Sequence, residues 1–290
     1  MAAMICQAMT SHLLLTVLVW FYSCAAYAQT AVSTADQFRA ANPEQRKQAL
    51  YAIVVHESTV ADSQRAAIIA LALSDPTLRE GALAAVVSRA AAPVIGPGVN
   101  GADEFKRQWL ADLANLQPLR PAVEGALQDL DERIRDRAIG ALASLDFDVN
   151  TLSIRLSPRT QKLLVDRYDL ESSARVRRRI VAGFAGESTA PSAEVRQLLM
   201  RAFSDPDPVI RGAATPAAQH LPIDVAMPLL LTQLADDSRD LRMQAILTIM
   251  KMPERARGHV EDLRTRLTIE TDPQIREMLA AAVKGMSGKN

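Results

Sequence analysis

The stretch SDPDPVIRGAA, from Ser204 to Ala214, decides the fold, because the spacing of its acid and arginine recurs elsewhere in the sequence. Asp205 stands six residues before Arg211, with two prolines between them and small apolar residues after them. Two interpretations are open for such a pair. It is either a catalytic carboxylate with an anion-binding arginine, or a structural contact that belongs to every unit of a repeat.

The pattern is an acid, five residues, an arginine, two residues and then a small or apolar residue. It recurs in four further pairs, which are Asp129/Arg135, Glu171/Arg177, Asp236/Arg242 and Glu270/Arg276. A partial copy has Arg79 with its acid, Asp75, only four residues before it. Spacings between successive arginines from Arg79 to Arg276 are 56, 42, 34, 31 and 34 residues. The last three spacings fit a stacked helix–turn–helix unit, and equivalent pairs spread along such a stack cannot all meet one substrate.

A second amphipathic segment precedes the arginine in most copies. These segments span residues 158–170, 192–203, 222–234 and 255–267. Apolar residues recur in them at three- and four-residue steps, as in Val195, Leu198, Leu199 and Ala202, which is the pattern of a helix with one buried face. The sequence therefore predicts an all-α fold built from helix pairs.

The residues from Ala226 to Ala245, A-x-P-L-L-x-x-x-L-x-D followed by L-R-x-x-A, resemble the HEAT repeat family. The likeness includes Pro228 inside the first helix and covers about Ala61 to Met286. It implies an α–α superhelix (solenoid) of about six helix pairs, with the second helix of each pair lining the concave surface. It also implies a binding or scaffolding role. Within this fold we expect each turn acid to bond to the arginine of its own unit and to the free N–H groups that open the second helix.

The N-terminal residues 1–28 have the shape of a signal peptide. An apolar run extends from Leu13 to Cys24, and Ala26 and Ala28 stand before Gln29 as a cleavage site requires. We therefore predict export to the periplasm or the medium, with residues 29–59 as N-terminal capping helices and 60–290 as the solenoid. Two alternatives are a membrane anchor formed by an uncleaved segment 13–28 and lipidation at Cys24. In the capping helices, Asn42 is the expected cap before Pro43.

Two segments interrupt the repeat. Residues Ala90–Phe105 are rich in Gly and Pro and predict a loop. The following segment, Asp103–Leu116, predicts an additional helix that carries Trp109, so residues 92–116 form an irregular insertion. Leu145–Pro158 is a second long connection.

Composition and motifs argue against several functions. The chain has 33 Lys+Arg and 33 Asp+Glu, so its formal charge is zero and favours no nucleic-acid partner. Both cysteines, Cys6 and Cys24, lie in the leader, and His56, His220 and His259 lack metal-site spacing. No catalytic or cofactor motif appears, so we predict a non-catalytic protein without cofactor or metal. The alternative is an auxiliary or lyase-like enzyme of the HEAT-like class.

The strongest candidate for partner binding is the basic run RVRRR, from Arg175 to Arg179. Arg177 fits the repeat position, so Arg175, Arg178 and Arg179 are the predicted surface for an acidic protein segment or glycan. The alternative is that these charges pair with acids of the neighbouring repeat. Trp109 is either a further anchor for the partner or a core residue. Membrane contact is expected only through the leader, if it stays uncleaved.

Overall fold

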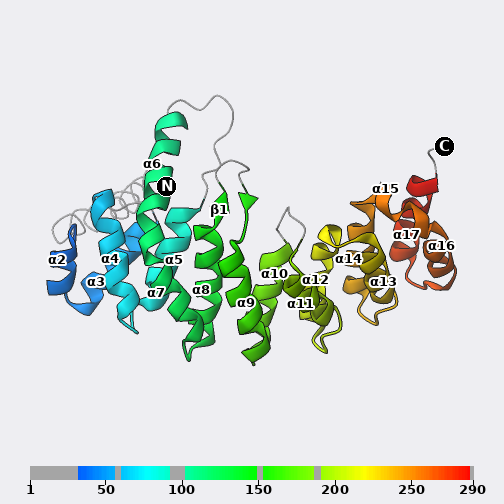
Figure 1. Ribbon diagram of the computed structural model, residues 1–290, viewed down its shortest axis with the longest axis horizontal. Helices are drawn as coiled ribbons and strands as arrows, with labels where there is room; N and C mark the ends of the chain where they lie inside the picture. Colours follow the sequence, from blue (N-terminus) through cyan, green and yellow to red (C-terminus); the bar gives the residue numbers. More distant parts are fainter. Residues whose placement is uncertain (1–31, 56–59, 92–101, 149–152, 186–190, 288–290) are drawn as a thin grey trace, which may run out of the picture.

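The computed structural model describes residues 32–55, 60–91, 102–148, 153–185 and 191–287. The predicted leader, residue His56 and the loop at 92–101 lie outside these ranges. Within them the chain forms a curved row of helices (Figure 1). None of the described helices is both long and apolar enough to cross a membrane.

The row consists of helix pairs, each with a first helix, a short turn and a second helix. The pairs are α4 (Asp62–Ser74) with α5 (Arg79–Ala90); α7 (Arg120–Gly125) and η2 (Ala126–Gln128) with α8 (Glu132–Leu145); α9 (Pro158–Leu170) with α10 (Ala174–Ala185); α11 (Ala193–Phe203) with α12 (Pro208–Ala214) and η3 (Thr215–His220); α13 (Ile223–Gln233) with α14 (Arg239–Met250); and α16 (Val260–Ile269) with α17 (Pro273–Ser287). Two helices, α2 (Ala35–Ala40) and α3 (Pro43–Val54), precede them, and α15 (Pro253–Ala256) and η4 (Arg257–His259) lie before α16.

Local signals in the sequence set the helix ends. The side chain of Asn42 accepts a hydrogen bond from Gln45 N, and Pro43 occupies the first turn of α3, as predicted. Ser192 caps α11 by accepting from Val195 N at 3.3 Å. Pro228 lies inside α13, also as predicted.

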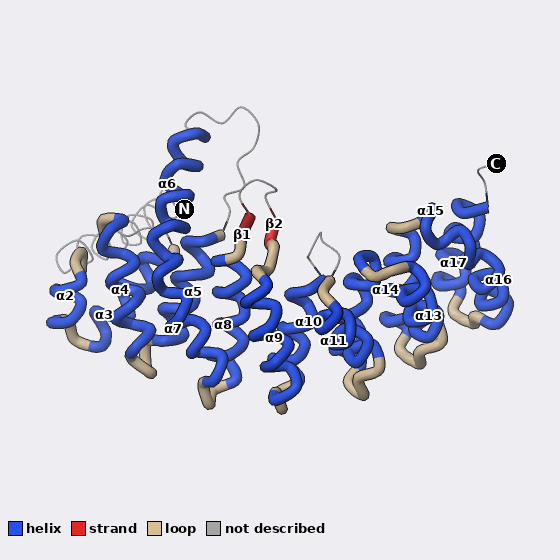
Figure 2. Tube along the Cα trace, viewed as in Figure 1, coloured by secondary structure: helices blue, strands red, loops and turns tan. Residues whose placement is uncertain are grey.

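The second helices stack on one another to form a continuous row, from α5 to α8, α10, α12, α14 and α17. One apolar core runs through the described units, because each pair buries its Ala- and Leu-rich faces against the next. In the view of Figure 2 the turns between the two helices of each pair lie along the lower, outer edge of the arc. The all-α superhelical solenoid predicted from the sequence is therefore confirmed.

The additional helix is present as α6 (Ala102–Leu116), followed by η1 (Gln117–Leu119). It packs on α4 and α5, and its first turns project above the row (Figure 1). The long connection after α8 contains a two-residue antiparallel pairing of β1 (Phe147–Asp148) with β2 (Ser153–Ile154). The sequence showed no strand-type alternation there, since two residues per strand are too few to establish a period.

Candidate functional site

The repeated acids and arginines lie in the turns between paired helices. Each acid accepts a hydrogen bond from the backbone N–H two residues later, as with Asp205 from Asp207 N and Asp236 from Ser238 N, both at 2.9 Å. Glu171 accepts in the same way from Ser173 N at 2.8 Å. These bonds satisfy donors at the start of the second helix, as predicted.

The arginines connect one unit to the next. Arg211 donates from Nη1 to the backbone oxygens of Asp205 at 2.8 Å and Pro206 at 3.0 Å. Its Nη2 reaches the carboxylate of Asp236, the acid of the following unit, at 2.9 Å. Equivalent ion pairs form the rungs Arg79–Asp129, Arg135–Glu171, Arg177–Asp205 and Arg242–Glu270. Arg79 differs in its backbone contact, because its Nε donates to the backbone oxygen of Leu73. We call these rungs, together with Arg211–Asp236, the ladder.

The ladder corrects the expected pairing. We expected the acid and arginine of one unit to form the charged contact, for example Asp129 with Arg135. Instead Arg135 donates to the backbone oxygen of Asp129 and pairs with the carboxylate of Glu171. The reason is geometric. The acid side chain caps the start of its own second helix, and in this position its carboxylate faces the arginine of the preceding unit.

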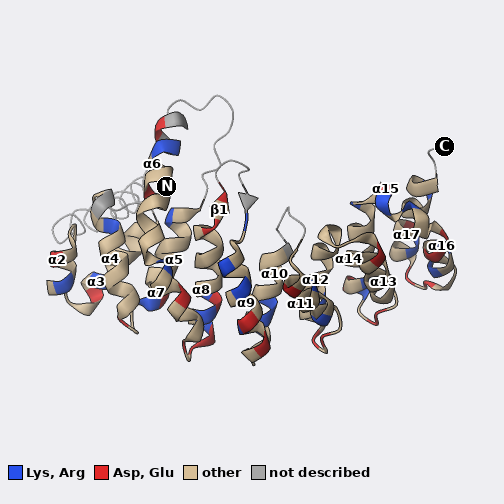
Figure 3. Cartoon of the chain, in the orientation of Figure 1, with Lys and Arg blue, Asp and Glu red and all other residues tan. Residues whose placement is uncertain are grey.

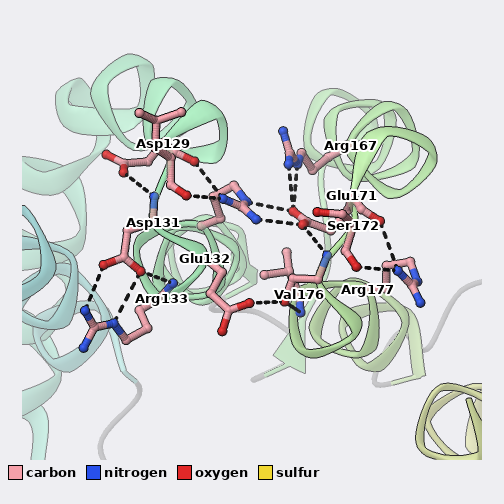
Figure 4. Close-up of polar contacts among 12 residues, drawn as sticks. Asp129, Asp131, Glu132, Arg133, Arg167, Glu171, Ser172, Val176 and Arg177 are labelled. Carbon is pink, nitrogen blue, oxygen red and sulfur yellow. Dashed lines mark hydrogen bonds and ion pairs between the residues drawn. The ribbon is translucent and has the colours of Figure 1, made fainter.

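The rung between Arg135 and Glu171 is the most buried of the ladder. Figure 4 shows Glu171 among its hydrogen-bonding partners. Nε and Nη2 of Arg135 donate to the two carboxylate oxygens at 2.8 and 2.7 Å, and the Glu171 side chain is 0% exposed. Burial alone would raise the pKa of Glu171, but hydrogen bonds from Arg135, Ser173 N and Arg167 outweigh it and hold the pKa at about 2. Glu171 is therefore charged at neutral pH and acts as a structural anion, not as a proton donor.

Sequence reasoning missed the first rung. Arg46 donates to the backbone oxygens of Phe38 at 3.0 Å and Arg39 at 2.6 Å, and lies 3.9 Å from the carboxylate of Asp75. The signal was its spacing, since Arg46 stands 33 positions before Arg79. At the other end, Arg276 is exposed, and among the described residues its side chain has no hydrogen bond or ion pair.

A second buried charged cluster, also missed, fixes α6. Asp112 of α6 lies between Arg65 of α4 and Arg89 of α5, with 2.9 Å between its Oδ1 and Nη1 of Arg65. Burial, followed by the neighbouring Arg89, lowers the pKa of Arg65. No repeated pattern marks this cluster in the sequence, because α6 is an insertion.

Trp109 is a core residue. Its ring is 6% exposed, its Nε1 donates to the backbone oxygen of Ala90 at 3.2 Å, and it meets Phe147 edge-on with ring centroids 5.4 Å apart. The predicted role as a partner anchor does not fit this position, since the indole is covered by the chain itself.

The three predicted surface arginines, Arg175, Arg178 and Arg179, lie on the exposed side of α10, and we call them the α10 patch. Arg175 pairs with Asp136 of α8 at 3.3 Å, as the alternative interpretation predicts. Arg178 and Arg179 are exposed, and no carboxylate of the described residues pairs with either. The guanidinium of Arg179 lies over α8, where its Nη2 is 2.6 Å from the position that a Cβ on Gly140 would take.

The remaining charges lie mainly along the turn edge, where blue and red segments alternate (Figure 3). No group of three or more His, Cys, Asp or Glu side chains in the described ranges is arranged to hold a metal ion. His220 is half-buried, and burial, with Arg255 beside it, lowers its pKa. His259 lies 3.0 Å from Asp262.

Comparisons with known proteins reveal the fold. No protein-family model and no curated protein matches the chain. Among solved structures, it is similar to a designed armadillo repeat protein in complex with peptide (KR)4, with 16% identity, a TM-score of 0.52 and coverage of 75% of this chain and 98% of that one. A computationally designed armadillo repeat protein for modular peptide recognition has 16% identity, a TM-score of 0.50 and coverage of 74% and 97%. An engineered structural-genomics target has 14% identity, a TM-score of 0.51 and coverage of 76% and 96%. The fold is a helical-repeat solenoid.

Proposed function

We propose that this chain is an exported, HEAT-like, non-catalytic scaffold that binds an acidic segment of a protein partner through the α10 patch. The observation that carries the proposal is the pair Arg178 and Arg179, which are exposed and lack carboxylate partners among the described residues. An exposed charge held near others of its sign favours a ligand of opposite charge.

The repeat proteins with similar folds support a peptide as the partner. One of them is solved with the basic peptide (KR)4, and another is designed for modular peptide recognition. This chain presents arginines on a second helix, so the complementary peptide is acidic. Enzymatic chemistry has less support, because the buried charged clusters of the described residues are explained by contacts between units and by the attachment of α6.

An acidic probe peptide tests the proposal. We expect a fluorescent (Glu-Ser)4 peptide to bind at low ionic strength, with anisotropy as the measurement, and a (Lys-Ser)4 peptide to bind at least tenfold more weakly. Reversing Arg178 and Arg179 to Glu should weaken binding of the acidic peptide at least tenfold. The matched control is the same reversal of Lys106 and Arg107, two consecutive exposed residues on α6. Equal affinity of the α10 variant and the parent chain would contradict the proposal.

Export is a separate part of the proposal and rests on the sequence of residues 1–28. Expression of the full chain followed by cell fractionation and N-terminal sequencing tests it. We expect a mature chain that begins at Gln29. A full-length chain retained in the membrane fraction would instead support the anchor formed by residues 13–28.

A further inference from the structure

The exposed side of α14 carries two large apolar side chains in its second half, whereas that of α10 carries arginines. Leu247 and Met250 are 45% and 41% exposed and stand three residues apart, so they lie on one face of the helix. The half-buried Met243 lies one turn before Leu247 on the same face. Other large apolar side chains of α14, such as Leu241, Ile246 and Ile249, are buried in the core. We call Met243, Leu247 and Met250 the α14 patch.

The repeat places the two patches on the same side of the row. Arg177 of α10 and Arg242 of α14 are equivalent ladder residues, so Arg178 corresponds to Met243 and Ala182 to Leu247. Helix α12 packs against both α10 and α14 and lies between them (Figure 1). The exposed faces of the three second helices therefore form one surface.

Between the patches, the surface of α12 and η3 lacks long side chains at the equivalent positions, and we call this surface the floor. The equivalent positions carry Gly212, Ala213 and Pro216, which leave no long side chain across the path. A Cβ on Gly212 would lie 3.1 Å from Leu241 Cδ2 and from Gln244 Oε1, so α12 and α14 approach closely here. A chain laid across this floor can contact both patches.

Charge determines which part of such a chain lies over each helix. Asp237 and Asp240 are exposed at the start of α14, and they repel a carboxylate placed there, because the exposed Arg239 between them is paired with Asp272. The exposed Lys251 lies beyond Met250, at the other end of the helix. Arg178 and Arg179 attract one at the other end. An acidic group is therefore favoured over α10, and an apolar group is favoured over α14.

We propose that the segment bound by this chain is bipartite, with acidic residues over the α10 patch and an apolar cluster over the α14 patch. This inference rests on the proposed function and specifies its ligand. The axes of packed helices are separated by about 8–10 Å, so the axes of α10 and α14, which are two helices apart, lie roughly 16–20 Å from each other. An extended peptide rises about 3.3 Å per residue, so about five or six residues separate the two parts of the ligand.

Three labelled peptides test the proposal by anisotropy: an acidic peptide EEDE, the same acids joined to LLF by the five-residue linker GSGSG, and a version with the two-residue linker GS. We expect the five-residue version to bind at least tenfold more tightly than EEDE alone, and the two-residue version to lose most of that gain, because it cannot span the floor. Replacing Leu247 and Met250 by Ser should abolish the gain and leave binding of EEDE unchanged. The matched control is Leu130→Ser with Leu170→Ser, two aliphatic side chains exposed at the turn edge.

The outcomes separate this inference from the proposed function. If EEDE binds and is lost in the variant with Arg178 and Arg179 reversed, but the five-residue version gains nothing, the bipartite ligand is wrong and the acidic site stands. If no acidic peptide binds, both fail. If the Leu247 and Met250 variant instead changes the oligomeric state of the free chain, measured by analytical ultracentrifugation, the α14 patch contacts a second copy and the inference is overturned.

Discussion

Each ladder arginine holds two units together, because its guanidinium is shared between them. In Arg242, Nη1 donates to the backbone oxygens of Asp236 and Asp237, while Nε donates to Glu270 of the next unit at 3.1 Å. The planar fork of arginine can serve these acceptors together, which a lysine cannot do. The contact therefore specifies the order and spacing of units as well as stabilising the turn.

Replacing Arg135 by Ala is expected to lower the free energy of unfolding by about 3 kcal/mol, because it leaves the buried Glu171 without its bidentate partner. Arg177→Ala is the matched variant, since its contact with Asp205 is longer, at 3.7 Å, and its side chain is more exposed. We expect a loss of about 1 kcal/mol there. Urea denaturation followed by circular dichroism measures both, and equal losses would contradict the ranking by burial.

The ladder also predicts a pH dependence centred on Glu171. Its pKa is about 2 in the folded chain, below the ordinary value of 4.5. The unfolded chain therefore takes up the proton first as the pH falls. The stabilisation is complete above about pH 5 and is lost progressively towards pH 2, by about 3 kcal/mol in total. Urea midpoints of the parent chain and of Glu171→Gln should converge as the pH falls, and a constant difference from pH 6 to pH 3 would contradict this assignment.

Among the helices, α6 departs from the repeat and has its own means of attachment. Asp112 binds Arg65 and Arg89, and Trp109 bonds to the end of α5, so one helix is fixed by both a buried charge cluster and an aromatic contact. A buried carboxylate between two arginines is sensitive to the loss of its charge.

Asp112→Asn is expected to loosen α6 before the rest of the chain unfolds. In a chain that begins at residue 29, Trp109 is the only tryptophan, so its emission reports the docking of α6. We expect the emission of the variant to shift to the red at a urea concentration at which the helical circular dichroism signal is unchanged. In the control variant Glu104→Gln, on the exposed side of α6, Trp109 emission and helicity should change at the same urea concentration. The same behaviour in Asp112→Asn would argue against independent docking.

The sequence predicted the elements well and the charged contacts only in part. Helix pairs, the cap at Asn42 and the insertion at α6 follow from local patterns, which one chain segment contains in full. The partner of each ladder acid lies in another unit, so it depends on how units stack, and a pattern within one unit suggested the wrong arginine. Asp112 and Trp109 depend on where the insertion docks, which no spacing encodes.

Over the whole molecule, the ladder predicts that the units are interchangeable. Each rung joins an arginine to the acid of the following unit, and every described unit from α4 to α14 has both parts. Removing a complete repeat therefore leaves no rung without a partner, although the apolar faces at the new junction differ from the original ones.

Deleting residues 206–236 tests this interchangeability. The deletion removes one repeat and places Asp205 six residues before Arg242, so Arg242 can bond to the Asp205 backbone and to Glu270. We expect a chain that folds reversibly with lower stability, as judged by circular dichroism and denaturation. Deleting only 208–222, which removes α12 and η3, brings two first helices together and is expected to prevent folding of the C-terminal units. Equal failure of both deletions would contradict the ladder as the determinant of register.

The position of the ladder has a mechanical consequence. The rungs lie in the turns along the outer edge of the arc, so they limit how far the units can separate on that side (Figure 2). When Glu171 and Glu270 take up protons, that side can spread while the apolar core still holds the units together. We expect the arc to become more curved before the helices unfold, and small-angle X-ray scattering near pH 2 should record a smaller radius of gyration at constant helicity. The curvature of the solenoid is therefore expected to depend on pH through the charged turns.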